Sequence, residues 1–66
     1  MTTTNFARRL KRLRAERQMS QADVAKRSGV SREYIARLEV GQQDPTLGTM
    51  QKLAKALKVT VGELVE

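Results

Sequence analysis

Apolar residues recur at helical spacing in five short segments of the chain, and no segment alternates apolar and polar residues over the length of a strand. Residues that favour helix starts and helix ends separate these segments. The pattern predicts an all-α fold with helices over about 5–17, 21–28, 32–39, 47–57 and 61–65. The start signals are Thr4 or Asn5, Ser20, Ser31, Thr46 and Thr60, and the stop signals are Gly29, Gly41 and Lys58-Val59.

The apolar members of these helices form the predicted core of a single domain over residues 1–66, in which we expect residues 1–4 to be disordered. Gly48 and Gly62 fall in first helical turns, where glycine costs up to about 1 kcal/mol relative to alanine, so both helices are expected to fray. The predicted core comprises Phe6, Leu10, Leu13, Val24, Ala25, Val30, Tyr34, Ile35, Leu38, Leu47, Met50, Leu53, Ala54, Leu57, Val59, Val61 and Leu64.

The composition excludes several classes of protein. The 66 residues include no cysteine and no histidine, and the acidic residues are scattered, so we expect no disulfide, no metal site, no cofactor and no catalytic residue. No apolar run approaches the roughly 20 residues that span a bilayer, and the first residues do not resemble a signal peptide. We therefore expect a cytoplasmic protein without a membrane partner or a small-molecule ligand.

Basic residues dominate the charge of the chain. The net charge is +6, and six basic residues lie within the first seventeen positions, where Glu16 is the only acid. Such a face attracts phosphate backbones or anionic membranes, although a solvated helix surface has the same composition. The six residues are Arg8, Arg9, Lys11, Arg12, Arg14 and Arg17.

The segment over residues 20–41 has the pattern of a helix-turn-helix: a helix of about eight residues, a tight turn through Ser28-Gly29-Val30, and a second short helix. On a helical wheel, Arg32, Glu33, Ala36, Arg37 and Val40 share the outer arc of the second helix. Arginine can donate two hydrogen bonds to guanine, glutamate can accept from cytosine, and an alanine methyl can contact thymine. Alternatively, the glutamate and arginine at i, i+4 spacing pair with each other on a solvated face.

Two charged residues lie at the edges of apolar stripes instead of on the outer arcs. Arg14 borders the stripe of the first helix, and Glu39 borders that of the third. A half-buried guanidinium needs a carboxylate partner, so we predict an Arg14–Glu39 ion pair that joins these helices.

With these features in register, residues 6–65 resemble a DNA-binding domain of the Cro and phage-repressor type, the XRE family of helix-turn-helix proteins. The resemblance implies a compact five-helix fold like that of lambda repressor, with the helix-turn-helix formed by helices 2 and 3. Its residues are Leu10, Leu13-Arg14, Met19-Ser20-Gln21, Val24-Ala25, Gly29-Val30-Ser31, Tyr34-Ile35, Leu38-Glu39, Gly41, Pro45-Thr46-Leu47, Leu53-Ala54, Leu57, Val59 and Leu64.

The resemblance also implies roles for individual residues. Gln21 occupies a position that holds a phosphate and braces the start of the recognition helix, over about 32–39. Tyr34 is open to two interpretations, core packing or a phosphate contact through its hydroxyl. Val40 replaces the polar or basic residue usual before the glycine, and Gln42 and Gln43 are uncharged where a lysine or arginine is frequent. The implied phosphate contacts are Ser20, Gln21, Ser31, Tyr34 and Gln42; the base-reading positions are Ser31, Arg32, Glu33 and Arg37, to which the wheel adds Ala36.

These features predict a sequence-specific regulator of transcription that binds double-stranded DNA as a dimer on a palindromic operator. The C-terminal apolar residues Val59, Val61, Leu64 and Val65 either contact the second subunit or only close the core. The sequence does not choose between a phage repressor and a controller of a restriction–modification system. An antitoxin or another protein-interaction module that also binds its promoter is the alternative, while an enzyme or a membrane-surface protein fits less well.

Overall fold

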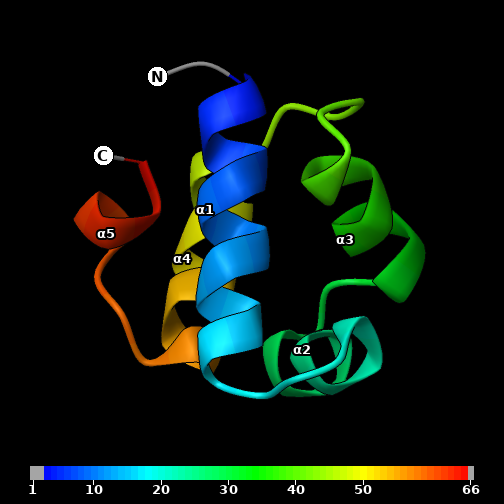
Figure 1. The fold of residues 1–66 in the computed structure, drawn as a ribbon, viewed down its shortest axis with the longest axis vertical. Coiled ribbons are helices and arrows are strands. Elements are labelled where there is room, and N and C mark those ends of the chain that lie inside the picture. Colours follow the sequence, from blue (N-terminus) through cyan, green and yellow to red (C-terminus); the bar gives the residue numbers. More distant parts are fainter. Residues whose placement is uncertain (1–2, 66) are drawn as a thin grey trace.

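The computed structural model describes the backbone of residues 3–65 and the side chains of residues 5–65. Five helices follow one another along this part of the chain, which contains no strand: α1 (Thr3–Glu16), α2 (Gln21–Ser28), α3 (Arg32–Glu39), α4 (Leu47–Leu57) and α5 (Val61–Val65) (Figure 1). The all-α prediction is confirmed, and the bounds of the last four helices are those expected.

The first helix differs from the prediction at both ends. It begins at Thr3, so the structure places Thr3 and Thr4 in the helix where the sequence predicted disorder, whereas residues 1 and 2 lie outside the described part. It ends at Glu16 because Gln18 takes a left-handed conformation, with φ 54°. The Met19 N–H then donates to the Arg14 carbonyl at 3.1 Å, which closes the helix and turns the chain toward α2.

Side-chain caps explain why the helices start where they do. The hydroxyl oxygens of Ser20, Ser31, Thr46 and Thr60 each accept a hydrogen bond from the backbone N–H three residues later, at 3.0–3.1 Å. Asp23 completes a capping box on α2, because its carboxylate accepts from the Ser20 backbone N–H at 2.9 Å. The start signals at these four residues are therefore confirmed.

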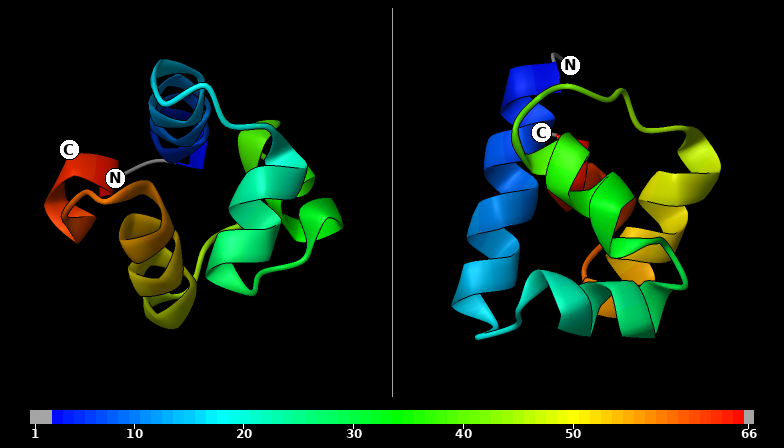
Figure 2. Two further views of the ribbon diagram at one scale, coloured as in Figure 1. Left: turned by 90° about the horizontal axis from the view of Figure 1, so that it is seen from below. Right: turned by 90° about the vertical axis from the view of Figure 1, so that its right-hand side faces the viewer.

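The helices enclose one apolar core. Helix α1 contacts α3 on one side and α5 on the other, while α2 packs against α3 and α4, and α4 also packs against α5 (Figures 1 and 2). Each helix contributes at least one fully buried apolar side chain, so the core holds all five together. These residues are Phe6, Leu10, Val24, Ile35, Leu38, Leu53, Leu57 and Leu64.

Four residues depart from the predicted core: Leu47, Met19, Ala7 and Ala56, the last two being buried although they were not predicted there. Leu47 is 61% exposed, because its stripe on α4 runs past the helices that cover it: Leu53 is buried, Met50 half-buried and Leu47 open. Met19, which was not predicted to lie in the core, is only 8% exposed in the α1–α2 connection. The other predicted core residues that are half-buried still pack against the core, namely Ala25, Val30, Tyr34, Met50, Val59 and Val61.

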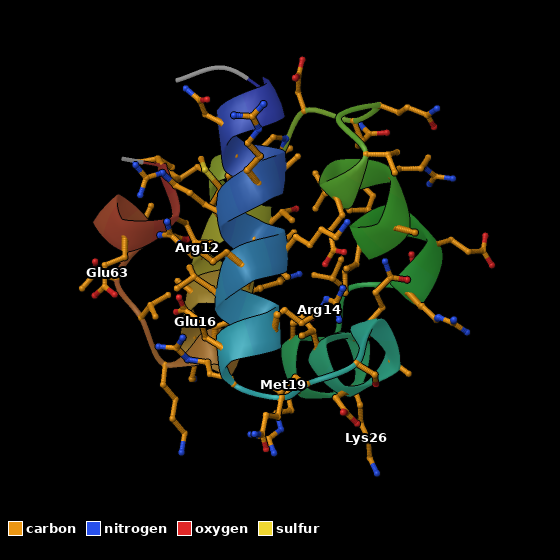
Figure 3. All side chains as sticks on the ribbon, in the orientation of Figure 1. Arg12, Arg14, Glu16, Met19, Lys26 and Glu63 are labelled. Atoms are coloured by element: carbon orange, nitrogen blue, oxygen red, sulfur yellow. The ribbon has the colours of Figure 1, made fainter. Side chains whose placement is uncertain are left out.

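The predicted ion pair between Arg14 and Glu39 is present and joins α1 to the end of α3. The guanidinium donates from Nε to Oε2 at 2.7 Å and from Nη2 to Oε1 at 3.0 Å, a two-pronged geometry. A third bond runs from Nη1 to the Met19 carbonyl at 2.9 Å. The Glu39 side chain is 4% exposed and that of Arg14 18%, and the hydrogen bonds to Glu39 raise the pKa of Arg14. Figure 3 shows Arg14 lying between α1 and α2–α3. We call this arrangement the clamp.

Truncating the clamp should destabilise the fold. Glu39→Ala removes both carboxylate acceptors of a largely buried guanidinium, and we expect the free energy of unfolding to fall by about 2–3 kcal/mol. Urea denaturation followed by circular dichroism measures the change. The matched control is Glu16→Ala, which also removes one acid but at a site where both partners of the 3.8 Å pair with Arg12 are more than half exposed. Its effect should stay within about 0.5 kcal/mol, and equal losses in the two variants would contradict the clamp.

A second prediction concerns the start of α4. A Cβ at Gly48 meets only Thr46 Oγ1, at 4.0 Å, and the backbone φ of Gly48 is not positive. Gly48→Ala should therefore stabilise the protein by up to about 1 kcal/mol. Gly29→Ala is the control, because φ there is +78° and a Cβ meets nothing within 4 Å, so only backbone strain operates. Thermal unfolding should show a higher midpoint for the first variant and a lower one for the second, and a destabilised Gly48→Ala would refute this account of α4.

Candidate nucleic-acid interface

The helix-turn-helix depends on the turn between α2 and α3. Gly29 ends α2 in the left-handed conformation, with φ 78°, and donates its backbone N–H to the Ala25 carbonyl at 2.9 Å. The Val30 N–H donates to the Ser28 hydroxyl at 3.1 Å, and the Val30 side chain packs against the core. The chain therefore reverses in a few residues and begins α3 at a defined angle.

One face of α3 is buried and the opposite face is open. Ile35 and Leu38 are fully buried, whereas Arg32, Glu33 and Arg37 are exposed. The structure thus brings these three predicted base-reading residues together on one surface, and adds Ala36, half-buried beside them.

The predicted alternative, in which this face neutralises itself, lacks support in the geometry. Glu33 and Arg37 form no ion pair within 4.0 Å in the described part of the chain. The polar groups of the outer face are therefore available to a ligand. A guanidinium next to a carboxylate can distinguish the edges of guanine and cytosine.

The two serines at helix starts are exposed, but both already serve as caps. Ser20 Oγ accepts from the Asp23 N–H, and Ser31 Oγ accepts from the Tyr34 N–H. The Ser31 hydroxyl keeps its own proton, which it can donate to a phosphate oxygen, whereas the Ser20 hydroxyl shares its proton with the Asp23 carboxylate. The hydrogen bonds from the backbone and the hydroxyl of Ser20 lower the pKa of Asp23, so this carboxylate stays ionised at the start of α2. An anion approaching α2 consequently meets a negative charge beside the serine.

Gln21 contacts α3 at its end instead of its start. Its Nε2 donates to Glu39 Oε1 at 3.1 Å, and Glu39 is the last residue of α3. The bracing role implied by the resemblance is therefore placed differently: Gln21 joins α2 to the clamp. Gln21 is half-buried, and its second amide N–H is available to donate to a phosphate.

The loop after α3 contains the remaining candidates. Tyr34 is half-buried against the core, and its hydroxyl donates to the Asp44 carbonyl at 3.4 Å, so the ring packs and the hydroxyl holds the loop. The Gln42 side chain is exposed, while its backbone N–H donates to the Arg37 carbonyl at 3.0 Å. Val40 at the end of α3 is 67% exposed. The loop therefore presents an amide and an apolar side chain near α3, without a cation.

Sequence reasoning missed one part of this site, the Met19 carbonyl that accepts from Arg14. Every residue except proline carries the same backbone groups, so no residue type marks such an acceptor. Leu64, for which the sequence left a subunit contact or core closure open, is fully buried within the chain and closes the core. Val59, Val61 and Val65 are half-buried at the surface near α5.

Neither a metal site nor a membrane-spanning helix is found among the described residues. No group of three or more acidic residues comes together there that could hold a metal ion. None of the described helices is long and apolar enough to cross a bilayer.

Comparisons with known proteins agree with this geometry. An uncharacterised HTH-type transcriptional regulator of Sinorhizobium fredii is 45% identical over 62 residues, which cover 94% of this chain and 75% of that protein. The transcriptional repressor of a cryptic CTXphi phage in Vibrio cholerae is 40% identical over 60 residues, so this chain spans about half of that protein (54%). A crystal structure of the restriction–modification controller protein C.AhdI from Aeromonas hydrophila matches with a TM-score of 0.91 and 37% identity over 94% of each chain.

The family comparison covers most of the chain. A model described as helix-turn-helix (HTH_3) matches residues 10–64, which include the clamp, the turn at Gly29 and the whole of α3. The resemblance to the Cro and phage-repressor type, predicted from the residues, is confirmed by this match and by the phage repressor among the relatives. The chain belongs to the helix-turn-helix family.

Proposed function

We propose that the protein is a sequence-specific regulator of transcription that inserts α3 into the major groove of double-stranded DNA. The observation that carries the proposal is the division of α3, with Arg32, Glu33 and Arg37 exposed on one face and the opposite face buried and clamped. The names of the relatives, transcriptional regulators and repressors, support the same function. The net charge of +6 favours the approach of a polyanion.

The proposed interface makes two kinds of contact, one with phosphates and one with bases. The hydroxyl of Ser31 and the amides of Gln21 and Gln42 donate to phosphates and set the position of the protein on the duplex. The Ser20 hydroxyl joins them by turning its proton from the Asp23 carboxylate to a phosphate. Arg32 or Arg37 can donate two hydrogen bonds to guanine O6 and N7, and Glu33 can accept from cytosine N4. Ala36 adds a small apolar surface against a thymine methyl. The Tyr34 hydroxyl contributes less, because it already donates to the loop carbonyl of Asp44.

The clamp gives this interface its geometry. A helix of eight residues is too short to be stable alone, so α3 keeps its orientation only through its contacts. Glu39 anchors its end to α1 and, through Gln21, to the start of α2. The elements that contact phosphates and bases are thereby joined at one carboxylate.

We further propose that two copies bind a symmetric site, because one recognition helix covers only a few base pairs. The half-buried residues Val59, Val61 and Val65 contribute to the contact between the copies. Half-sites should then lie about 34 Å apart, one turn of the duplex.

The base-reading role of α3 can be tested by truncation. Arg32→Ala and Arg37→Ala should each cost about 1–3 kcal/mol of binding and relax specificity at a particular base pair. In-vitro selection from random DNA defines the site, and titration against single-base variants measures the discrimination. Lys55→Ala, which removes an exposed cation from α4, is the control and should keep the specificity unchanged. A loss spread evenly over all sequences would make that arginine a phosphate contact.

The symmetric assembly has its own test. Selection should enrich an inverted repeat, and sedimentation should detect two protein chains on each site. A selected motif without inverted symmetry, together with a monomer at high concentration both with and without DNA, would contradict the dimer. The absence of any enriched motif would overturn the proposed function as a whole.

A further inference from the structure

A second basic surface lies on α1. Asn5, Arg8, Arg9 and Arg12 line one hollow. Their spacing of three, one and three residues places them on a single stripe of the helix. We call this surface the arginine stripe. Its flank of α1 faces α5, as Arg12 and Glu16 show in Figure 3, whereas α3 lies on the other side of α1. A duplex that fills the outer face of α3 therefore leaves the arginine stripe uncovered.

The charge on the arginine stripe is only partly compensated. Arg12 pairs loosely with Glu16, at 3.8 Å, and Glu16 also lies 4.0 Å from Arg17. No carboxylate lies within 4.0 Å of the guanidinium groups of Arg8 and Arg9 in the described structure. Like charges three and four residues apart destabilise a helix. The stability of the fold therefore does not explain why these arginines lie together.

A second basic hollow on the molecule shows the contrast. It is lined in part by Arg17, Arg27 and Lys58, where α1, α2 and α4 end. Cations at those positions compensate the negative ends of the helices, and Arg17 also donates to the Leu13 carbonyl at 3.4 Å. Those basic residues lie at helix C-termini, where their charge stabilises the fold, whereas the arginine stripe lies within α1, away from its C-terminal end.

The lining of the stripe indicates the class of partner. All four side chains are polar, and an acidic peptide would find no apolar pocket among them for an anchoring side chain. A phosphate backbone needs only cations in a row, and a duplex carries one negative charge for about every 1.7 Å of its axis. Arg8 and Arg12 lie one helical turn apart, so they can contact neighbouring phosphates of one strand.

We infer that the arginine stripe binds the phosphate backbone of a second DNA duplex while α3 holds the first. The protein then bridges two segments of DNA, and this activity adds to the proposed function, on which it rests only for the occupancy of α3. The second contact is independent of sequence, because guanidinium–phosphate contacts carry no base information.

The experiment compares second-duplex binding in two matched variants. Protein saturated with its selected site is titrated with a labelled duplex that lacks the site, over a range of salt concentrations. The test variant is R8Q/R12Q, and the control is K52Q/K55Q; all four side chains are exposed, each variant lowers the net charge equally, and glutamine preserves the helix. The salt slope of second-duplex binding should fall by about 2 in the test variant, for two lost phosphate contacts, and clearly less in the control.

Several outcomes would overturn the inference. An equal fall of the salt slope in both variants would mean that the net charge of the protein, and not the arginine stripe, attracts the second duplex. A loss of affinity for the selected site, or a change in oligomeric state, in R8Q/R12Q alone would assign the stripe to operator contact or to subunit contact. Stronger binding of polyglutamate than of the duplex at the stripe would favour an acidic protein partner.

A separate readout distinguishes this inference from the proposed function. The backbone amides of residues 5–12 and those of α3 are followed by NMR while the free protein is titrated with the duplex that carries its selected site. Shifts over residues 5–12 without shifts in α3 would support the stripe and refute the reading role of α3. Shifts confined to α3 would refute the stripe and leave the proposed function intact.

Discussion

The two-pronged pair between Arg14 and Glu39 connects more helices than any other side-chain hydrogen bond in the described part of the chain. One carboxylate accepts from the guanidinium of α1 and from the amide of Gln21 on α2, and it belongs to the last residue of α3. The same guanidinium holds the Met19 carbonyl in the α1–α2 connection. A charge as buried as that of Glu39 is stable only with such partners, so the three helices must meet in one geometry for the network to close.

The clamp also explains how so small a domain presents a charged helix to solvent without losing its position. Ile35 and Leu38 attach α3 to the core, but apolar contacts are non-directional and tolerate small rotations. The hydrogen bonds at Glu39 have defined directions and remove that freedom. The outer arginines can then meet base edges in a geometry prepared before DNA arrives, which lowers the entropic cost of binding.

The basic residues of the chain separate into groups with different physical roles. Arg14 is structural, the cations at the ends of α1, α2 and α4 offset helix dipoles, and Arg32 with Arg37 faces outward from α3. The arginines in the hollow of α1 belong to none of these groups. Net charge alone cannot reveal this division, because it depends on where each helix ends and on what lies beside it.

Local chemistry made much of the fold predictable from the sequence. Caps such as Ser20 and Ser31 act within three residues, and a stripe such as Phe6–Leu10–Leu13 follows from helical geometry, so helix bounds and most core positions could be inferred. The partners Arg14 and Glu39 were also predictable, because each stands at the edge of an apolar stripe. Only the tertiary structure decided how far the neighbouring helices extend, which leaves Leu47 exposed, and which of its two predicted roles Leu64 takes. It alone also placed Gln21 on Glu39 instead of at the start of α3. Exposure and side-chain contacts between helices depend on elements distant in the chain. The spacing of residues along one helix therefore cannot predict them.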